Sequence, residues 1–129
     1  MFEIHNTKEI PLLRVNAQVF KHSRFGCTHL HLDCDSTEKA FSVAFRTIPK
    51  DHSGIAHILE HTVLCGSEKY PVRDPFFMMT RRSLSTFMNA MTYPDITAYP
   101  FATLNDKDYR NLLSVYLDAA FFPNIDELD

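Results

Sequence analysis

The residues of this sequence that point most directly to chemistry are two histidines four positions apart, His57 and His61, with Glu60 directly before the second. Each residue of an α-helix turns by about 100°, so these three side chains fall within an arc of about 100°. Two imidazoles at positions i and i+4 can bind one zinc ion, with zinc–nitrogen bonds of about 2.0–2.1 Å. The spacing therefore predicts a zinc site formed by His57 and His61.

The position of Glu60 predicts a hydrolase in which this carboxylate is the general base. Zinc lowers the pKa of its water to roughly 7. Glu60 would take a proton from that water during attack on a peptide carbonyl and pass it to the leaving amine. The alternative is a helix whose histidines face solvent. With seven histidines in 129 residues, the pattern is expected by chance about 0.02 times, which favours the catalytic interpretation.

The helix that carries these residues is expected over residues 54–65. Ser53 is the expected N-cap, and Gly66 suits the position that follows the last turn. The side of the helix opposite the three polar residues is apolar and is therefore expected to be buried. The residues on that side are Ile55, Leu59 and Val63.

The rest of the sequence predicts an α+β fold, a mainly antiparallel sheet with helices packed on one face. Strands are expected across residues 11–47, which are rich in β-branched and aromatic residues. A helix is expected to begin at Pro75, since proline is favoured at the first helical position. Strands in residues 85–103 are expected to form a hairpin. A last helix is expected over 106–120, with a capping box begun by Asn105.

Composition limits the classes of partner. The net charge of −3 and the isoelectric point of about 6.1 provide no basic surface for nucleic acid. No apolar run approaches the roughly 18 residues of a membrane span, so neither nucleic acid nor a membrane is expected. Three cysteines without paired spacing favour a reducing compartment over a disulfide framework.

The order His-x-x-Glu-His is the inverted zinc motif, and the sequence around it resembles the pitrilysin/insulinase family of zinc metallopeptidases, in particular its presequence protease branch. The resemblance covers residues 40–129 closely and residues 1–39 in outline. The segments that carry it are Ser53–Ser67, Lys69–Pro71, Arg73–Phe77, Ser83–Thr92 and Leu112–Pro123.

This resemblance implies a large, two-halved enzyme that encloses unfolded peptides, such as targeting presequences, and cuts them inside a chamber. It implies that Asn89 and Ala90 hold the substrate backbone at a sheet edge, through main-chain hydrogen bonds that demand little of the substrate sequence. It also implies cytoplasmic localisation for a bacterial protein, and the mitochondrial matrix or another organelle for a eukaryotic one whose transit peptide is removed.

The family's third zinc ligand is a glutamate on a later helix. The only glutamates after Glu60 are Glu68, which is too near, and Glu127, which we do not assign as a ligand. We therefore expect the third ligand beyond residue 129. Residues 1–129 would then be a truncated N-terminal portion of the catalytic domain, inactive alone and dependent on the C-terminal remainder of the peptidase.

Other interpretations remain open. The chain could be a non-catalytic peptide-binding or assembly subunit, or a truncated product without independent function, although the intact motif favours a peptidase. A second metal site around His29 and His31, with Cys27 and Asp33 on the same strand face, is possible. A solvated polar face is the favoured interpretation of that strand.

Overall fold

The computed structural model describes residues 1–125 and divides the chain into two compact units, residues 1–37 and the part that begins at Glu38. Each unit has its own antiparallel sheet. No helix in the described residues is both long and apolar enough to cross a membrane. Glu127, which we do not assign as a ligand, lies outside the described residues.

The first unit is a three-stranded antiparallel sheet in the order β1-β2-β3. A short 3-10 helix and a left-handed residue, Arg14 (φ 53°), connect its first two strands. The sequence does not predict β1, because a register shift between Ile4 and Asn6 breaks its alternation and its side chains are almost all exposed. The elements are β1 (Phe2–Ile10), the 3-10 helix (Pro11–Leu13), β2 (Val15–His22) and β3 (Thr28–Cys34).

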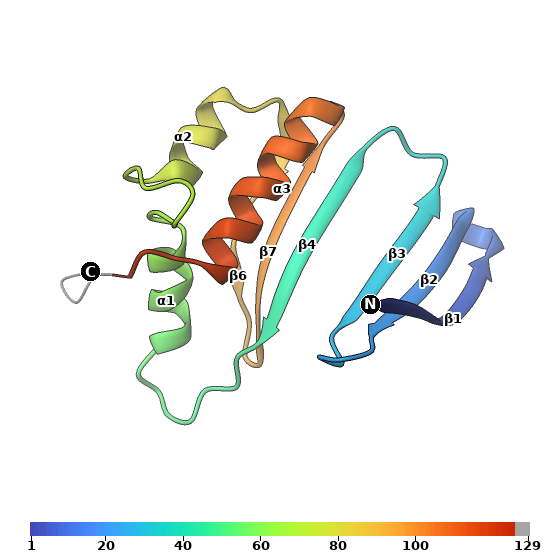
Figure 1. Cartoon of the computed structure of the whole chain (residues 1–129), viewed down its shortest axis with the longest axis horizontal. Helices are drawn as coiled ribbons and strands as arrows, with labels where there is room; N and C mark the ends of the chain where they lie inside the picture. The colour runs from blue at the N-terminus through green and yellow to red at the C-terminus, as the bar shows by residue number, and fades with distance from the viewer. Residues whose placement is uncertain (126–129) are drawn as a thin grey trace. The chain divides into compact units, whose positions relative to one another are not determined.

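The second unit has a four-stranded antiparallel sheet in the order β4-β7-β5, with the short strand β6 also paired to β7 (Figure 1). Three helices accompany this sheet, which confirms the α+β prediction. The elements are β4 (Lys39–Arg46), α1 (Ile55–Val63), α2 (Pro75–Arg82), β5 (Ser85–Met88), β6 (Met91–Thr92), β7 (Ile96–Thr103) and α3 (Asp106–Phe121).

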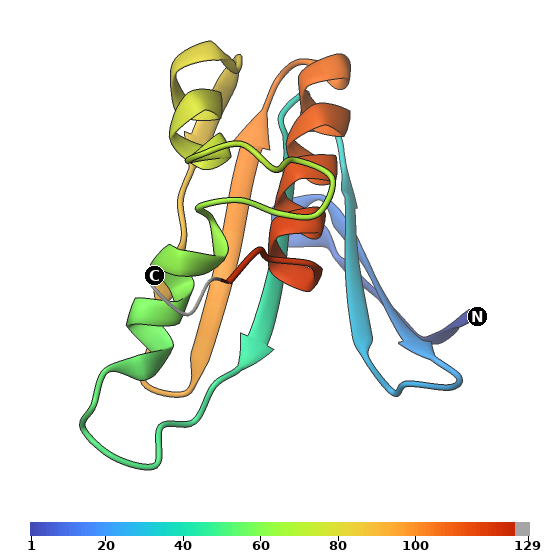
Figure 2. The ribbon, with the colours of Figure 1, turned by 60° about the vertical axis from the view of Figure 1, so that its left-hand side comes forward.

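Helices α1 and α3 pack on the same face of this sheet (Figure 2). Tyr99 and Phe101 are two positions apart on β7, so their side chains point to one face. Both belong to a buried cluster that also holds Val63 from α1 and Tyr116 from α3. The rings of Phe101 and Tyr116 lie 5.1 Å apart between centroids. Burying each such side chain contributes roughly 1.5–3 kcal/mol, so this cluster fixes both helices on the sheet.

The N-terminus of α3 is capped as its sequence predicts, but the capping box is incomplete. The side-chain oxygen of Asn105 accepts hydrogen bonds from the backbone N–H groups of Lys107 and Asp108, each at 3.0 Å. The Asp108 carboxylate accepts from the Ser83 hydroxyl at 3.0 Å, which ties α3 to the end of α2. Asp108 is therefore used in a tertiary contact.

Residues 85–103 contain three strands, because Asn89 and Ala90 separate β5 from β6. The register of the flanking pairs places Asn89 opposite Pro100 on β7. The Asn89 N–H donates to the Pro100 carbonyl at 3.1 Å. Proline has no N–H to return the second bond of this pair, so the ladder is incomplete there.

Candidate metal site

Helix α1 begins at a glycine. Gly54 has a positive φ of 74°, in the left-handed region that favours glycine, and its carbonyl accepts from the backbone N–H groups of His57 and Ile58. The predicted cap by Ser53 is wrong, because its hydroxyl bonds to the Asp51 carboxylate at 2.5 Å. That same bond lowers the pKa of Asp51. The helix start is therefore set by backbone conformation.

The two histidines of α1 bring their ring nitrogens together. The Nε2 atoms of His57 and His61 are 3.2 Å apart, and both side chains are exposed. Two nitrogens about 2.05 Å from a shared zinc ion and 3.2 Å apart subtend about 103° at the metal, near the tetrahedral angle. The pair therefore fits two ligand positions of a zinc ion.

A third protein ligand is not found in the part of the chain that the structure describes. Within residues 1–125, no group of three or more histidine, cysteine, aspartate or glutamate side chains could hold a metal ion. Catalytic zinc sites use three protein ligands and leave a further position open. Of the three ligands that such a site needs, the histidine pair of α1 could supply two.

Glu60 lies on the side of α1 that faces the sheet. Its side chain is only 5% exposed, and its Oε2 atom accepts a hydrogen bond of 2.5 Å from the hydroxyl of Thr92 on β6. Burial, and then the negative charge of Glu60, raise the pKa of Tyr99 on β7 to about 12. The carboxylate is therefore set between α1 and strands β6 and β7, on the helix that carries the two exposed histidines.

The expectation that the apolar side of α1 is buried is wrong for two of its three residues. Val63 is buried, but Ile55 is 65% and Leu59 is 43% exposed. The helix packs on β6 and β7 through Glu60 and Val63. Helical periodicity identifies the two sides of α1, but it does not say which side the sheet covers.

The Asn89–Ala90 segment is bonded on one side and open on the other. The Asn89 carbonyl accepts a hydrogen bond of 3.3 Å from the hydroxyl of Tyr116 on α3. Strand β5 is at the edge of the sheet, and backbone groups of successive residues alternate in direction along a strand. Those of Ala90 therefore point away from β7. The Ala90 N–H is bonded to the Asn89 side-chain oxygen at 3.0 Å.

Thr92 and Tyr116 also belong to this region, although the sequence did not predict either of them there. Thr92 is two positions after Ala90 and so lies on the same face of the segment, a signal that alternation alone provides. Tyr116 is in the apolar pattern of α3, which predicts a core residue and gives no sign that its hydroxyl bonds to Asn89.

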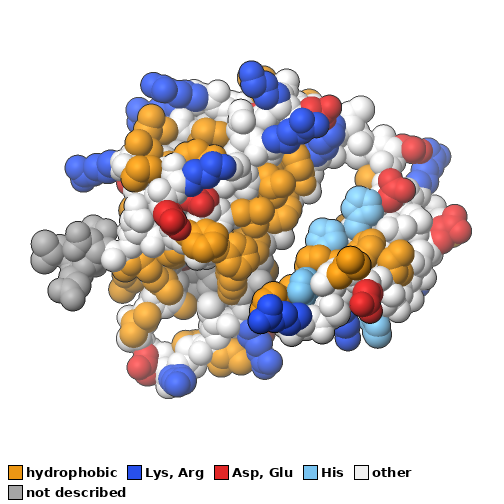
Figure 3. Space-filling view, in the orientation of Figure 1, with side chains coloured by type: hydrophobic (Ala, Val, Ile, Leu, Met, Phe, Trp, Pro, Cys, Tyr) orange, Lys and Arg blue, Asp and Glu red, His pale blue; other side chains and the backbone are white. Residues whose placement is uncertain are grey.

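The first unit does not provide a second metal site among the described residues. Histidine and apolar side chains share the visible face of its sheet (Figure 3), and the side chains of β3, including His29 and His31, are exposed. No metal-binding group forms there within residues 1–125.

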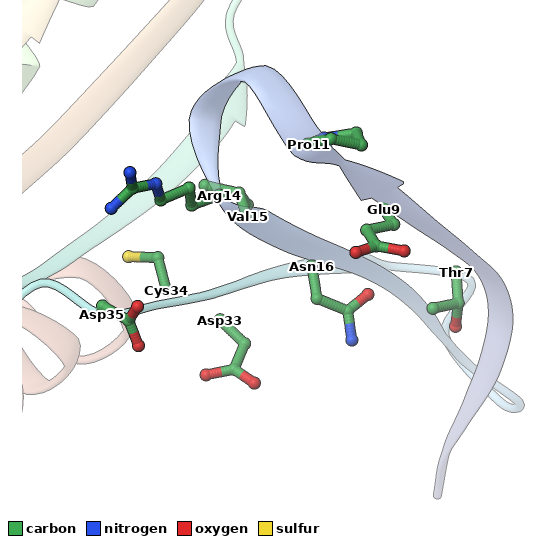
Figure 4. A pocket seen from close by; sticks show the side chains of 9 residues that line it. All are labelled: Thr7, Glu9, Pro11, Arg14, Val15, Asn16, Asp33, Cys34 and Asp35. Atoms are coloured by element: carbon green, nitrogen blue, oxygen red, sulfur yellow. The ribbon is translucent and has the colours of Figure 1, made fainter.

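A separate open depression of about 720 Å³ lies at one end of the three-stranded sheet. It holds carboxylates of Glu9 and Asp33, and Arg14 points away from them (Figure 4). No salt bridge joins Arg14 to either carboxylate in the described residues. This depression is distinct from the histidine pair, which is in the second unit.

Comparison with known proteins identifies the family. The model of the insulinase family, peptidase family M16, matches residues 46–129, which is more than half of the chain. The chain therefore belongs to the insulinase family of peptidases.

Within this family, the chain is similar to mitochondrial presequence proteases. It is 56% identical over 128 residues to that of Mus musculus and 54% identical over 129 residues to that of Candida albicans. Each match covers 99% of this chain and 12% of the relative, so the chain spans about an eighth of their length. The crystal structure of pitrilysin has the same fold, with a TM-score of 0.80 at 21% identity, over 99% of this chain and 14% of that one.

Proposed function

We propose that this chain is the motif-bearing part of a zinc-dependent endopeptidase that degrades unfolded peptides, such as targeting presequences. The observation that carries the proposal is the approach of His57 Nε2 to His61 Nε2, at 3.2 Å, beside the buried carboxylate of Glu60. The names of the relatives support the substrate class, since they are presequence proteases.

The roles follow from the chemistry of each side chain. His57 and His61 would hold the zinc ion through their Nε2 atoms, in the inverted order of the motif. Zinc, when bound, would supply Lewis-acid activation of a water molecule and of the peptide carbonyl. Glu60 would accept a proton from the attacking water and donate it to the leaving amine as the C–N bond breaks.

We propose that Asn89 and Ala90 bind the substrate backbone. The edge position of β5 supports this role, because an extended peptide can add to an open sheet edge through main-chain hydrogen bonds. In the structure, the Ala90 N–H donates a hydrogen bond to the side-chain oxygen of Asn89. A substrate carbonyl would take its place, and the released Asn89 amide could bond to the peptide.

The third zinc ligand is proposed to be a glutamate that follows residue 129, together with a C-terminal remainder that completes the site. Two observations support this: no group of three possible metal ligands forms within residues 1–125, and the chain spans 12% of the length of its relatives. The 129-residue chain alone would then be inactive or nearly so. It would act only as a peptide-binding or assembly fragment, which is the alternative function.

The proposed compartment follows the relatives, which are named as mitochondrial. For a eukaryotic source we propose the mitochondrial matrix, and for a bacterial source the cytoplasm. Fluorescence imaging of the tagged gene product in its own cells tests this proposal, and a signal at the cell surface would contradict it.

The direct test is hydrolysis of an unstructured peptide by the complete gene product, wild type beside Glu60→Gln. The loss of the general base is expected to lower kcat by roughly 10²–10⁴-fold while zinc content is unchanged. Glu68→Gln is the matched control, since Glu68 is exposed in the loop that follows α1, and it should keep wild-type activity. Wild-type hydrolysis by Glu60→Gln would refute the proposed role.

A further inference from the structure

We infer that Thr92 is a positioning residue, which fixes the carboxylate of Glu60 for proton transfer. The inference rests on the proposed function and adds a residue to it. Its basis is the hydrogen bond from Thr92 Oγ1 to Glu60 Oε2, at 2.5 Å, which joins strand β6 to helix α1. The two residues are 32 positions apart in the sequence, so the fold creates this contact.

The position of Thr92 is fixed by its pairing with strand β7. It pairs with Thr97 on β7 in the antiparallel register, and Thr97 is buried with its hydroxyl 2.7 Å from that of Thr47. A β-branched side chain has restricted χ1 rotation. The backbone pairing and the stiff side chain therefore present the Thr92 hydroxyl to Glu60 in one orientation.

The hydrogen bond makes the two carboxylate oxygens of Glu60 different, because only one of them is held by Thr92. Oε2 accepts from Thr92, and Oε1 accepts no hydrogen bond within residues 1–125. A glutamate side chain rotates about three bonds, so one anchored oxygen restricts where the other can lie. Oε1 is then the oxygen that exchanges a proton with water and the leaving amine.

Thr92 also links the general base to the proposed substrate edge. Ala90 precedes Thr92 by two residues, and the pairing with β7 keeps one register from Met88 to Met91, so both side chains lie on the same face. The β6 segment thereby sets the distance between the peptide backbone and Glu60. A small displacement of a catalytic group can cost as much as about 10²-fold in rate, so the anchor is expected to affect the chemical step.

The test compares kinetics of the complete gene product with an unstructured peptide, for wild type, Thr92→Val and Thr92→Ser. Valine keeps the shape and removes the donor, and serine keeps the donor. Thr92→Val is expected to lower kcat about 10-fold or more with KM and zinc content little changed, and Thr92→Ser to restore most of kcat. The control is Thr80→Val, because the Thr80 hydroxyl donates to the Phe77 carbonyl within α2 and belongs to neither the proposed metal site nor the substrate edge.

A second readout uses the metal-free protein and no activity. Hydrogen exchange over α1 should become several-fold faster in Thr92→Val than in wild type, because the strand no longer anchors the helix. In a Glu60→Leu background the same substitution should change exchange little, since the bond is already absent. Equal acceleration in both backgrounds would contradict a bond between these two side chains.

The outcomes separate this inference from the proposed function. Wild-type kcat in Thr92→Val, with hydrolysis lost in Glu60→Gln, would overturn the positioning role and leave the peptidase proposal intact. A raised KM at unchanged kcat would also overturn it, since Thr92 would then act on substrate binding alone. Wild-type hydrolysis by Glu60→Gln would refute the proposed function, and with it the positioning role that depends on it. Thr92→Ala gives the same test should the valine variant not fold.

Discussion

The hydroxyl of Tyr116 donates a hydrogen bond to the backbone carbonyl of Asn89, at 3.3 Å. In an unbroken antiparallel ladder this carbonyl would accept from the residue opposite, but that residue is Pro100, which has no N–H. A side chain from α3 thus replaces a missing strand hydrogen bond. This bond attaches the Asn89–Ala90 segment to α3. The edge of the sheet that faces away from β7 stays open.

Removing that hydroxyl should loosen the edge. Tyr116→Phe is expected to lower the free energy of unfolding by roughly 0.5–1.5 kcal/mol, because the Asn89 carbonyl loses its donor in a half-buried hydrogen bond. Chemical denaturation measures the change. Tyr109→Phe is the matched control, since Tyr109 is also on α3 and packs on Phe101 through its ring. Equal stability losses in the two variants would contradict a specific role for the Tyr116 hydroxyl.

Alkaline pH should destabilise the folded chain through Tyr99. Its pKa is about 12 in the fold, against about 10 in an unfolded chain. Between these values the unfolded state has released a proton that the folded state keeps. The contribution of Tyr99 is therefore fully present below pH 10 and is lost as pH rises towards 12.

Denaturation from pH 9 to pH 11.5 measures this dependence. Tyr99→Phe should make the fall in stability shallower, because phenylalanine cannot ionise. Some dependence should remain, since burial also raises the pKa of Tyr116. An unchanged slope in Tyr99→Phe would show that ionisation of Tyr99 is not responsible.

The cap of α3 provides a test of local stability. Asn105→Ala removes the acceptor for two backbone N–H groups and is expected to cost about 1 kcal/mol of unfolding free energy. Asn111→Ala, at an exposed position inside the same helix, should be neutral or slightly stabilising, because alanine has the higher helix propensity. Thermal unfolding of both variants compares the two effects, and a neutral Asn105→Ala would count against the cap.

Metal removal should abolish peptide hydrolysis by the complete gene product. A zinc chelator is expected to reduce activity to background, and added zinc to restore it, because His57 and His61 would hold the ion reversibly. Activity that persists after the metal content has fallen to zero, measured by elemental analysis, would contradict a metal-dependent reaction.

The sequence was informative where local spacing decides the structure. The i, i+4 spacing of His57 and His61 places their side chains on one face of any α-helix, and their Nε2 atoms are 3.2 Å apart in the structure. The N-cap at Asn105 likewise depends on neighbouring residues. Prediction failed where distant segments decide the outcome. The burial of Glu60 depends on which strands lie beneath α1.

Strand β1 shows a different limit. Its side chains are almost all exposed and a register shift interrupts it, so no burial pattern marks it in the sequence. The bonds from Thr92 to Glu60 and from Tyr116 to Asn89 join residues 32 and 27 positions apart. Neither has a local signal, because each requires the sheet and helices to be assembled first.

Zinc binding by the purified 129-residue chain, compared among wild type, His61→Ala and His52→Ala, distinguishes an incomplete metal site from a complete one. We predict weak one-to-one binding that is lost in His61→Ala and kept in His52→Ala, because His52 is exposed in the loop before α1. Tight binding would contradict the missing third ligand. Binding that survives in His61→Ala would contradict the metal site itself.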